Sequence, residues 1–315
     1  RFTAYLLMLL VSIIWGVAGP VIKFSLHDFP PLIFLTYRFA ISTLIALIFF
    51  TSTRTKLPRT SKQWETVVAY SILGVTLGLG LLFFGFDKTT SLTGSLLSSL
   101  SPLATVIAGA WFLREHVTRI ERLGIGLALV GTLVTIVGPL WLNGGNHQGT
   151  GIGSLEGNML VVASIAVDTW ATLLVKTALR QGLSGSVLAH LSFVIGLATI
   201  GPAALAIHGT SGIFAALAHA PLSAHLGVWY MALISGTLAY TLRNIAVKSI
   251  EVSEIAVFAY LYPLFAAPLA ILWLGEPLTT PFLFGAGLIA VGVVIAEYKR
   301  RHKGQRRTHA RRHRR

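Results

Sequence analysis

The chain has no cysteine and very little charge for its length. None of its 315 residues is cysteine, which excludes disulfide bonds and thiolate chemistry. Charged residues make up 11% of the sequence, whereas soluble domains usually contain about 25%. Apolar residues make up 54%, and the mean hydropathy is +0.74. We therefore predict an all-α polytopic membrane protein whose main solvent is the bilayer.

Several motifs of enzymes and pumps are also missing. No phosphate-binding Gly-Lys-Ser/Thr loop occurs, so we expect no ATP-driven engine in this chain. No Gly-x-Ser-x-Gly nucleophile motif is present. His208, His219 and His225 lie close in sequence but lack the short His-x-x-His spacing of zinc sites. We expect no metal, no cofactor and no enzymatic activity, so ion or substrate gradients must supply any driving force.

The apolar residues form ten runs, each long enough for a membrane-spanning helix of about 20 residues. A glycine-rich stretch, 143–155, separates two groups of five. We predict a first repeat at 1–142, a second repeat at 156–298 and a disordered basic tail at 299–315. The ten runs are 4–23, 31–50, 65–86, 91–113, 119–142, 156–179, 187–207, 225–247, 254–274 and 281–298.

The distribution of lysine and arginine predicts the orientation. With the N-terminus inside, the connections on that side carry 22 of the 25 Lys and Arg residues, and the opposite side carries only Lys23 and Lys88. Positive residues favour the cytoplasmic side. Both termini are therefore predicted to be cytoplasmic, in the plasma (inner) membrane.

A repeat relates the two halves. Residues 100–131 and 261–292 align without a gap at an offset of 161, with 11 of 32 positions identical. Because each half has five predicted spans, the second half enters the membrane from the opposite face. Such inverted repeats are typical of alternating-access transporters with a substrate site near the midplane. Duplication without transport is the alternative. The identical pairs include Pro102/Pro263, Glu115/Glu276, Thr118/Thr279, Gly124/Gly285, Gly126/Gly287 and Gly131/Gly292.

The repeated residues have physical roles. Pro102 and Pro263 are expected in mid-helix, where each frees a carbonyl and bends the helix. Glu115 and Glu276 are expected in tight helix–helix turns, accepting backbone N–H groups. The glycines at 124, 131, 285 and 292 allow close helix approach.

Four segments carry a family resemblance: "IIWGVAGPVIK" (13–23), "YRFAIS" (37–42), "LREHVT" (113–118) and "LYPLFAAPLAILWLGEPLT" (261–279). Together they resemble the EamA family of the drug/metabolite transporter superfamily, over two repeats. The resemblance implies a ten-helix transporter with a central cavity. Members often export amino acids or other small metabolites, and relatives carry nucleotide sugars or sugar phosphates. The positions matching the family's patterns are Trp15, Gly16, Lys23, Arg38, Glu115, Trp170, Ala171 and Glu276.

Polar side chains at helical spacing predict which faces line a cavity. Lipid accepts such stripes poorly, so they face protein or water. Hydrogen bonding between helices without a ligand is the alternative for each Ser and Thr. The candidates are Trp15 and Gly19 in the first span, Ser95, Ser98 and Ser99 in the fourth, Asp168 and Thr172 in the sixth, Thr237, Tyr240 and Asn244 in the eighth, and Tyr260 in the ninth.

Charged residues inside the spans are sharper candidates. Asp168 is predicted either to face the cavity, binding a cationic group or a proton, or to form a structural salt bridge with Arg243. Arg38 is an anion contact or, as the favoured alternative, reaches the interface or pairs with backbone carbonyls. Lys23 contacts an anionic substrate or, as we favour, marks the membrane boundary.

The tail at 299–315 holds ten Lys and Arg residues and no acid. It is predicted to lie on anionic lipid headgroups. It has no aromatic residue for base stacking, so no nucleic-acid partner is expected.

These observations predict a secondary transporter that exports small metabolites such as amino acids. Two alternatives belong to other classes: a membrane-embedded enzyme, and a non-transporting scaffold or receptor. The oligomeric state does not follow from the sequence.

Overall fold

The computed structural model describes residues 2–53, 55, 57–112, 119–143, 153–247 and 258–295. Every regular element in these ranges is a helix, which confirms the predicted all-helical class for this part of the chain. Six helical segments are long and apolar enough to cross a membrane: Phe2–Ser25, Pro31–Ser52, Ser61–Lys88, Leu155–Arg180, Gly185–His219 and Leu222–Arg243. Shorter apolar helices are Arg122–Thr135, Phe258–Leu272 and Thr280–Ile295. The full set of ten spans stays a prediction.

The helices follow the predicted runs closely at most ends. The first half contains α1 (Phe2–Ser25), α2 (Pro31–Ser52), α3 (Ser61–Tyr70), the π-helical η1 (Ser71–Gly78), α4 (Leu79–Lys88), α5 (Ser91–Ser98), α6 (Ser101–Phe112) and α7 (Arg119–Asn143). The second half contains α8 (Leu155–Arg180), α9 (Gly185–His219), α10 (Leu222–Trp229), the π-helical η2 (Tyr230–Leu238), α11 (Ala239–Val247), the 3₁₀ turn η3 (Phe258–Leu261), α13 (Tyr262–Leu272) and a final helix, Thr280–Ile295.

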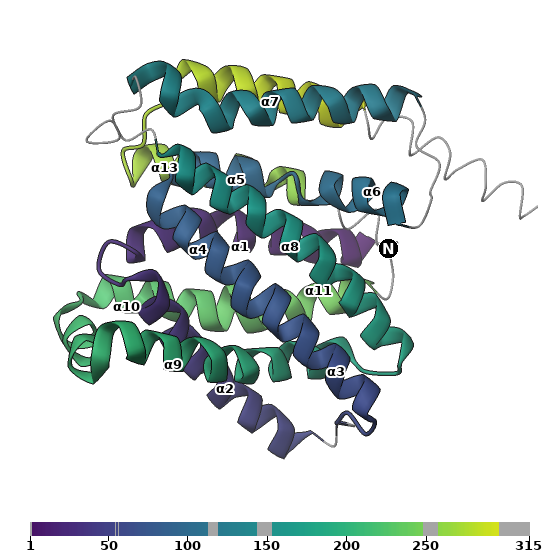
Figure 1. Ribbon diagram of the computed structural model, residues 1–315, viewed down its shortest axis with the longest axis vertical. Helices are drawn as coiled ribbons and strands as arrows, with labels where there is room; N and C mark the ends of the chain where they lie inside the picture. Colours follow the sequence, from purple (N-terminus) through teal and green to yellow (C-terminus); the bar gives the residue numbers. More distant parts are fainter. Residues whose placement is uncertain are drawn as a thin grey trace, which may run out of the picture. The chain divides into compact units, whose positions relative to one another are not determined.

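The chain forms two compact units. Unit 1 contains Arg1–Pro102 and Glu156–Glu276, and unit 2 contains Leu103–Leu155 and Pro277–Arg315. Each unit takes segments from both halves of the sequence. In unit 1, α1 packs against α13, α11, α10 and α5, and α2 packs against α9 (Figure 1).

Aromatic side chains fill the core of unit 1. Phe29, Phe34, Phe39 and Phe83 have no exposed surface. The rings of Phe34 and Phe83 meet edge to face with centroids 4.9 Å apart. Lipid is as apolar as these side chains, so close packing rather than burial from water stabilises the contacts.

Unit 2 brings the glycine faces of the two repeats together. Figure 1 shows α7 (teal) beside the final helix (yellow). A Cβ atom on Gly131 would lie 2.7 Å from the carbonyl oxygen of Gly285, and one on Gly292 would lie 2.6 Å from that of Gly124. The backbones therefore touch through these four glycines, which confirms the predicted close approach.

The repeated prolines start helices rather than bend them. The fourth predicted span is broken between α5 and α6, and Pro102 is the second residue of α6. Pro263 is the second residue of α13, after η3. The prediction that both prolines lie in mid-helix is therefore corrected. The backbone N–H groups in the first turn of a helix make no intrahelical hydrogen bond. Proline, which lacks this N–H, therefore fits there without the loss of a hydrogen bond.

Two further features depart from regular α-helix. Adding the repeat offset of 161 to the residue numbers of η1 gives 232–239, which overlaps η2. Both repeats therefore contain a π-helical segment at nearly the same place. The helical structure of α9 continues past the predicted end at 207 to His219, across an interruption at Gly209 with φ of 65°. Such π-helical segments occur frequently at functional sites.

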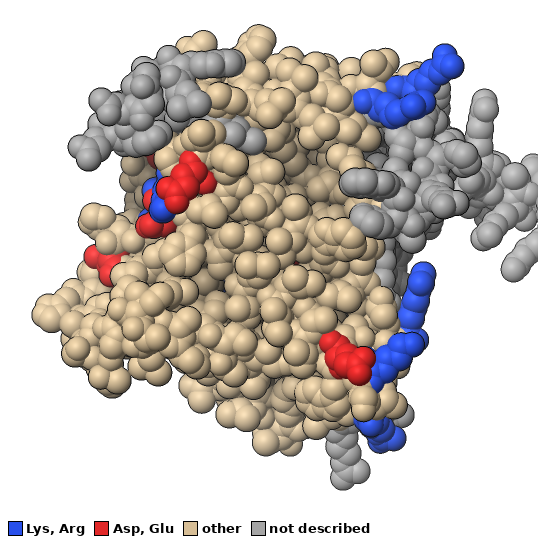
Figure 2. Space-filling model, viewed as in Figure 1, with Lys and Arg blue, Asp and Glu red and all other residues tan. Residues whose placement is uncertain are grey.

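In one membrane-length segment of unit 1 the charged residues lie only at the two ends. The continuous segment Ser61–Lys88 has Lys62 and Glu65 in its first turns and Asp87 and Lys88 at its end, with no charge between. Figure 2 shows charged side chains gathered at the edges of the drawn face, with an uncharged band between them. This is the pattern expected of helices that cross a hydrocarbon layer.

Candidate functional site

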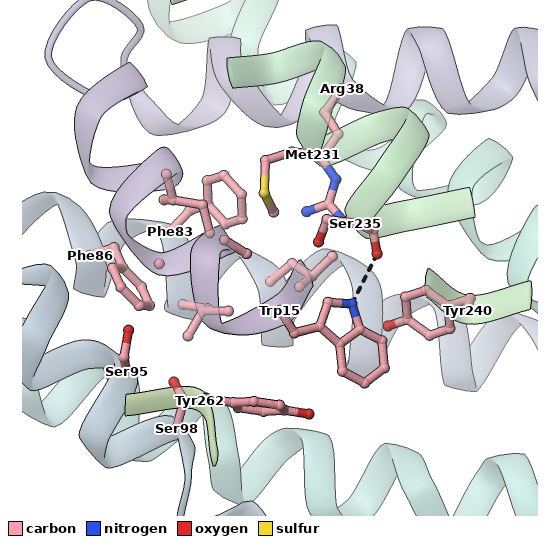
Figure 3. A pocket seen from close by; sticks show the side chains of 15 residues that line it. Trp15, Arg38, Phe83, Phe86, Ser95, Ser98, Met231, Ser235, Tyr240 and Tyr262 are labelled. Atoms are coloured by element: carbon pink, nitrogen blue, oxygen red, sulfur yellow. Dashed lines mark hydrogen bonds between the residues drawn. The ribbon is translucent and has the colours of Figure 1, made fainter. Parts of the chain in front are cut away.

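Unit 1 contains a cavity of about 170 Å³ (Figure 3). Its walls come from α1, α2, α4, α5, η2, α11 and the start of α13. Five of the residues predicted from helical spacing lie here: Trp15, Gly19, Ser95, Ser98 and Tyr240. The other lining residues are Ala18, Ile22, Arg38, Leu79, Leu82, Phe83, Phe86, Met231, Ser235 and Tyr262.

Trp15 forms one wall of the cavity. Its Nε1 donates to the carbonyl oxygen of Ser235 at 3.0 Å. Its ring meets those of Tyr240 and Tyr262 edge to face, with centroids 5.4 and 6.2 Å apart. Ser235 belongs to η2, and a π-helical turn offers carbonyls that a regular helix would use internally. The indole is thus fixed as a flat apolar surface between two phenol rings.

Arg38 is buried in the opposite wall. Only 4% of the residue is exposed, and its guanidinium points into the cavity near Met231 and Ser235 (Figure 3). The guanidinium carbon lies 5.8 Å from the ring centroid of Phe83. Its Nε has no hydrogen-bond partner. The favoured prediction placed this side chain at the interface or on backbone carbonyls. The structure differs because α2 is packed into the core, so the side chain has no path to the headgroups.

The three serines predicted to line the cavity near α5 divide into two groups. Ser95 Oγ lies directly against the backbone of Gly19, so α1 and α5 touch there. Ser98 Oγ is buried, lines the cavity and has no hydrogen-bond partner. Ser99 Oγ instead donates to the carbonyl oxygen of Leu96 at 2.7 Å. Ser95 and Ser98 therefore face the cavity, whereas Ser99, the residue after α5, bonds back to the last turn of that helix.

Asp168 does not line the cavity, but its charge acts on residues that do. Its carboxylate acts on Arg243, Tyr240 and Tyr262. Among the described side chains, an ion pair within 4.0 Å joins only Lys88 and Glu156. Asp168 and Arg243 are therefore coupled at longer range than a contact salt bridge. An exposed carboxylate in the middle of α8 is costly in lipid, which favours a wet surrounding.

Other predicted cavity residues have partners elsewhere. Thr172 Oγ1 donates to the carbonyl oxygen of Asp168 at 2.9 Å, within α8. Thr237 Oγ1 donates to the carbonyl oxygen of Ala232 at 3.3 Å. Tyr260 lies in η3, outside the cavity lining. The side chain of Asn244 and the whole of Glu115 lie outside the described residues.

Lys23 and Glu276 hold the connection between α4 and α5. Lys23 Nζ donates to the carbonyl oxygens of Phe86 at 3.0 Å and Asp87 at 2.8 Å, at the end of α4. Glu276 Oε1 accepts from the backbone N–H of Ser91 at 2.6 Å, and Oε2 from that of Leu92 at 2.8 Å. Glu276 thus caps the start of α5, a helix of the first repeat, rather than its own turn.

Two cavity residues, Ser235 and Tyr262, were not predicted from helical spacing. The helical spacing that predicts Thr237 and Tyr240 assumes that the whole span is α-helical. The π-helical turn of η2 shifts the phase of the helix, so Ser235 shares a wall with Tyr240. Within the described residues, no group of three or more His, Asp or Glu side chains is placed to hold a metal ion.

Comparison with known proteins identifies the family. The sequence matches the EamA-like transporter family twice, over residues 2–137 and 156–298. The chain belongs to the EamA-like transporter family. It is accordingly a multi-pass membrane protein with the transporter fold of two EamA repeats, a transporter rather than an enzyme, and its partner is a small-molecule substrate.

Relatives of full length agree with this assignment. The chain is 28% identical to a probable amino-acid metabolite efflux pump of Salmonella typhimurium, over 92% of this chain and 93% of that protein. It is 26% identical to a protein of the same name in Escherichia coli, over 92% and 93%. An uncharacterized transporter of Bacillus subtilis, YyaM, is 24% identical over 93% and 92%.

A solved crystal structure has a similar fold. It superposes with a TM-score of 0.59 at 16% sequence identity, covering 96% of this chain and 99% of that chain. At this identity the likeness concerns the fold alone.

Proposed function

We propose that this EamA-like transporter is a secondary exporter of amino-acid-sized metabolites. It crosses the plasma membrane ten times, as two inverted repeats of five spans at 1–142 and 156–298 joined by the linker 143–155. Both termini are cytoplasmic, and the basic tail 299–315 lies on anionic lipids. The two repeats open the cavity alternately to each side. The observation that carries the proposal is the cavity between Trp15, Arg38 and Tyr240, inside an apolar helical unit.

The size of the cavity supports a small substrate. Pockets for drug-sized ligands measure about 300–1,000 Å³, whereas this one measures about 170 Å³. A nucleotide sugar is larger than a typical drug, so this alternative is disfavoured. The names of the Salmonella and Escherichia relatives agree with an amino-acid-sized solute leaving the cell.

The recurrence of irregular helices supports alternating access. Helix breaks precede Pro102 and Pro263, and π-helical segments recur at overlapping positions of the two halves. Discontinuous helices at corresponding positions of two repeats are typical of transporters, where they surround the substrate site. Within this proposal, Trp15, Gly19, Ser95, Ser98 and Tyr240 contact the solute, and the breaks are the places where helices change direction.

Flux measurements test the proposal. The purified protein in proteoliposomes is expected to exchange at least one labelled amino acid in counterflow, and to exchange no labelled nucleotide sugar. Protein-free liposomes are the control. If no member of a panel of amino acids, sugars and nucleotide sugars exchanges faster than in the control, the protein is a scaffold or receptor instead.

Asp168→Asn tests the proposed role of the carboxylate in binding a cationic group or a proton. Because the charge of Asp168 acts on Tyr240 and Tyr262 in the cavity wall, we expect its loss to lower counterflow about tenfold, which corresponds to about 1.4 kcal/mol. Glu156→Gln is the matched control, because Glu156 is an exposed carboxylate at the start of α8. A variant with normal flux and a lower melting temperature would show that Asp168 is structural.

A further inference from the structure

The cavity contains a cation without a counter-ion. Arg38 is the only Lys or Arg side chain in its lining, and no hydrogen bond or ion pair to the guanidinium is present in the described part of the chain. Tyr240 is the neighbour that acts on it electrostatically. A buried charge without a partner is strongly destabilising. The cavity wall therefore supplies no negative charge that pairs with Arg38 among the described residues.

We propose that Arg38 binds the carboxylate group of the transported solute. This inference rests on the proposed transport function and names the chemical class of its substrate as a monocarboxylate. The planar guanidinium offers parallel N–H donors that match the two oxygens of a carboxylate.

Aromatic side chains hold the guanidinium in place. Its central carbon lies 5.8 Å from the ring centroid of Phe83 and 6.0 Å from that of Phe39. Such cation–π contacts stabilise the charge without using its N–H donors. The rings therefore orient Arg38 toward the cavity and leave its donors free for a ligand.

The rest of the cavity fits the remainder of such a solute. Ser98 and Tyr262 lie across the cavity from Arg38, with Trp15 between (Figure 3). Ser98 Oγ is a second buried polar atom without a partner. Phe86 and Met231 add apolar surface. A solute with its carboxylate on Arg38 would place an apolar or weakly polar body against Trp15 and a polar atom near Ser98.

The charge balance favours a carboxylate over a phosphate. One guanidinium matches a single negative charge, whereas a phosphate dianion would need a second cation in the wall. No second Lys or Arg lines the cavity within the described residues. A solute with a single carboxylate group is therefore the better complement.

Binding to the purified protein in detergent tests the inference separately from transport. Calorimetry and ligand-induced thermal shifts are measured with each proteinogenic amino acid, with the amine made by removing its carboxylate, and with inorganic phosphate. We expect the wild type to bind at least one amino acid and to bind the matching amine about 10- to 100-fold more weakly. Arg38→Gln is expected to weaken binding of the amino acid by the same factor, but to leave binding of the amine as strong or stronger, because the cationic amine is no longer repelled by the guanidinium.

Two variants separate binding from folding. Arg38→Lys keeps the charge and the stem but loses the fork of donors, so its affinity should lie between those of the wild type and Arg38→Gln. Arg180→Gln removes a guanidinium from an exposed position at the end of α8 and should bind as the wild type does. If Arg38→Gln does not fold, the acid-over-amine preference of the wild type and the partial loss in Arg38→Lys decide.

Three results would overturn the inference. They are equal affinity of the wild type for acid and amine, binding of phosphate but of no amino acid, and an Arg38→Gln variant that melts earlier but keeps its affinity and its preference for the acid. The proposed function fails separately, if proteoliposomes exchange no solute at all.

Discussion

Replacing Glu276 with alanine is expected to lower the free energy of unfolding by about 3 kcal/mol or more. Glu276 is 9% exposed, and its carboxylate accepts two backbone N–H groups at the start of α5. Its removal leaves both donors buried without acceptors, and each such donor costs about 1–3 kcal/mol. The negative charge also lies at the positive end of the helix dipole, where it is stabilising.

The position of this carboxylate depends on the turn before it. Gly275 has φ of 66°, a left-handed conformation that side-chain-bearing residues rarely adopt. The backbone N–H of Glu276 donates to the carbonyl oxygen of Ala270 at 2.9 Å. The chain thus turns sharply after α13 and directs Glu276 toward α5. Loss of the carboxylate would remove both hydrogen bonds between this turn and the start of α5.

Thermal unfolding in detergent, followed by size-exclusion chromatography, measures this effect. Glu156→Ala is the matched control. Glu156 is 64% exposed and pairs with Lys88 at the surface, so its loss should cost between about 0 and 1 kcal/mol. Glu276→Gln keeps one oxygen acceptor and should fall between the two. Equal melting temperatures for Glu276→Ala and Glu156→Ala would show that the two N–H contacts contribute nothing to stability.

Adding a methyl group at Gly131 or Gly292 is expected to destabilise unit 2 by about 2–3 kcal/mol for each change. A Cβ on Gly131 would meet the carbonyl oxygen of Gly285 at 2.7 Å and the backbone nitrogen of Ile289 at 2.8 Å. A Cβ on Gly292 would meet the backbone nitrogen of Ala128 at 2.5 Å. These are backbone atoms, so no side chain can move aside and the two helices must separate.

The same helices provide the controls. Gly126 and Gly287 are equivalent in the two repeats, and a Cβ on either meets nothing within 4 Å. Gly126→Ala and Gly287→Ala should be neutral or stabilise by up to about 1 kcal/mol, because alanine favours helix over glycine. Melting temperatures of the four alanine variants, each compared with the wild type, test the contact. If the two pairs shift equally, helix propensity alone explains the result and the glycine contact is unimportant.

These two contacts have one feature in common, which concerns how the repeats join. Glu276 of the second repeat caps α5 of the first, and Gly285 and Gly292 of the second repeat pack on Gly124 and Gly131 of the first. Identical sequence motifs therefore meet partners in the other half. The offset of 161 in the sequence shows that the residues are related, but it does not show what each one contacts.

The cavity illustrates the limit of sequence patterns. Helical spacing predicts five residues that do line the cavity, because polar and small residues at helical spacing stand out in apolar spans. These residues are Trp15, Gly19, Ser95, Ser98 and Tyr240. The same spacing gave equal weight to Ser99, Thr172 and Thr237, whose hydroxyls donate to carbonyls of their own helical segments. Hydroxyl groups in membrane helices have this local option, and a sequence does not reveal which option is taken.

The sequence by itself determined the solvent and the class of this protein. A chain with so little charge and so many long apolar runs lies mostly in lipid, where no water can bind the backbone N–H and C=O groups. An α-helix satisfies these groups within a single segment, so the apolar runs form helices. Only the tertiary structure decided that Arg38 is buried in a cavity, that Pro102 begins a helix and that Ser235 faces Trp15. These outcomes depend on contacts between residues far apart in the sequence and on helix breaks and π-helical turns, which change the phase that local periodicity assumes.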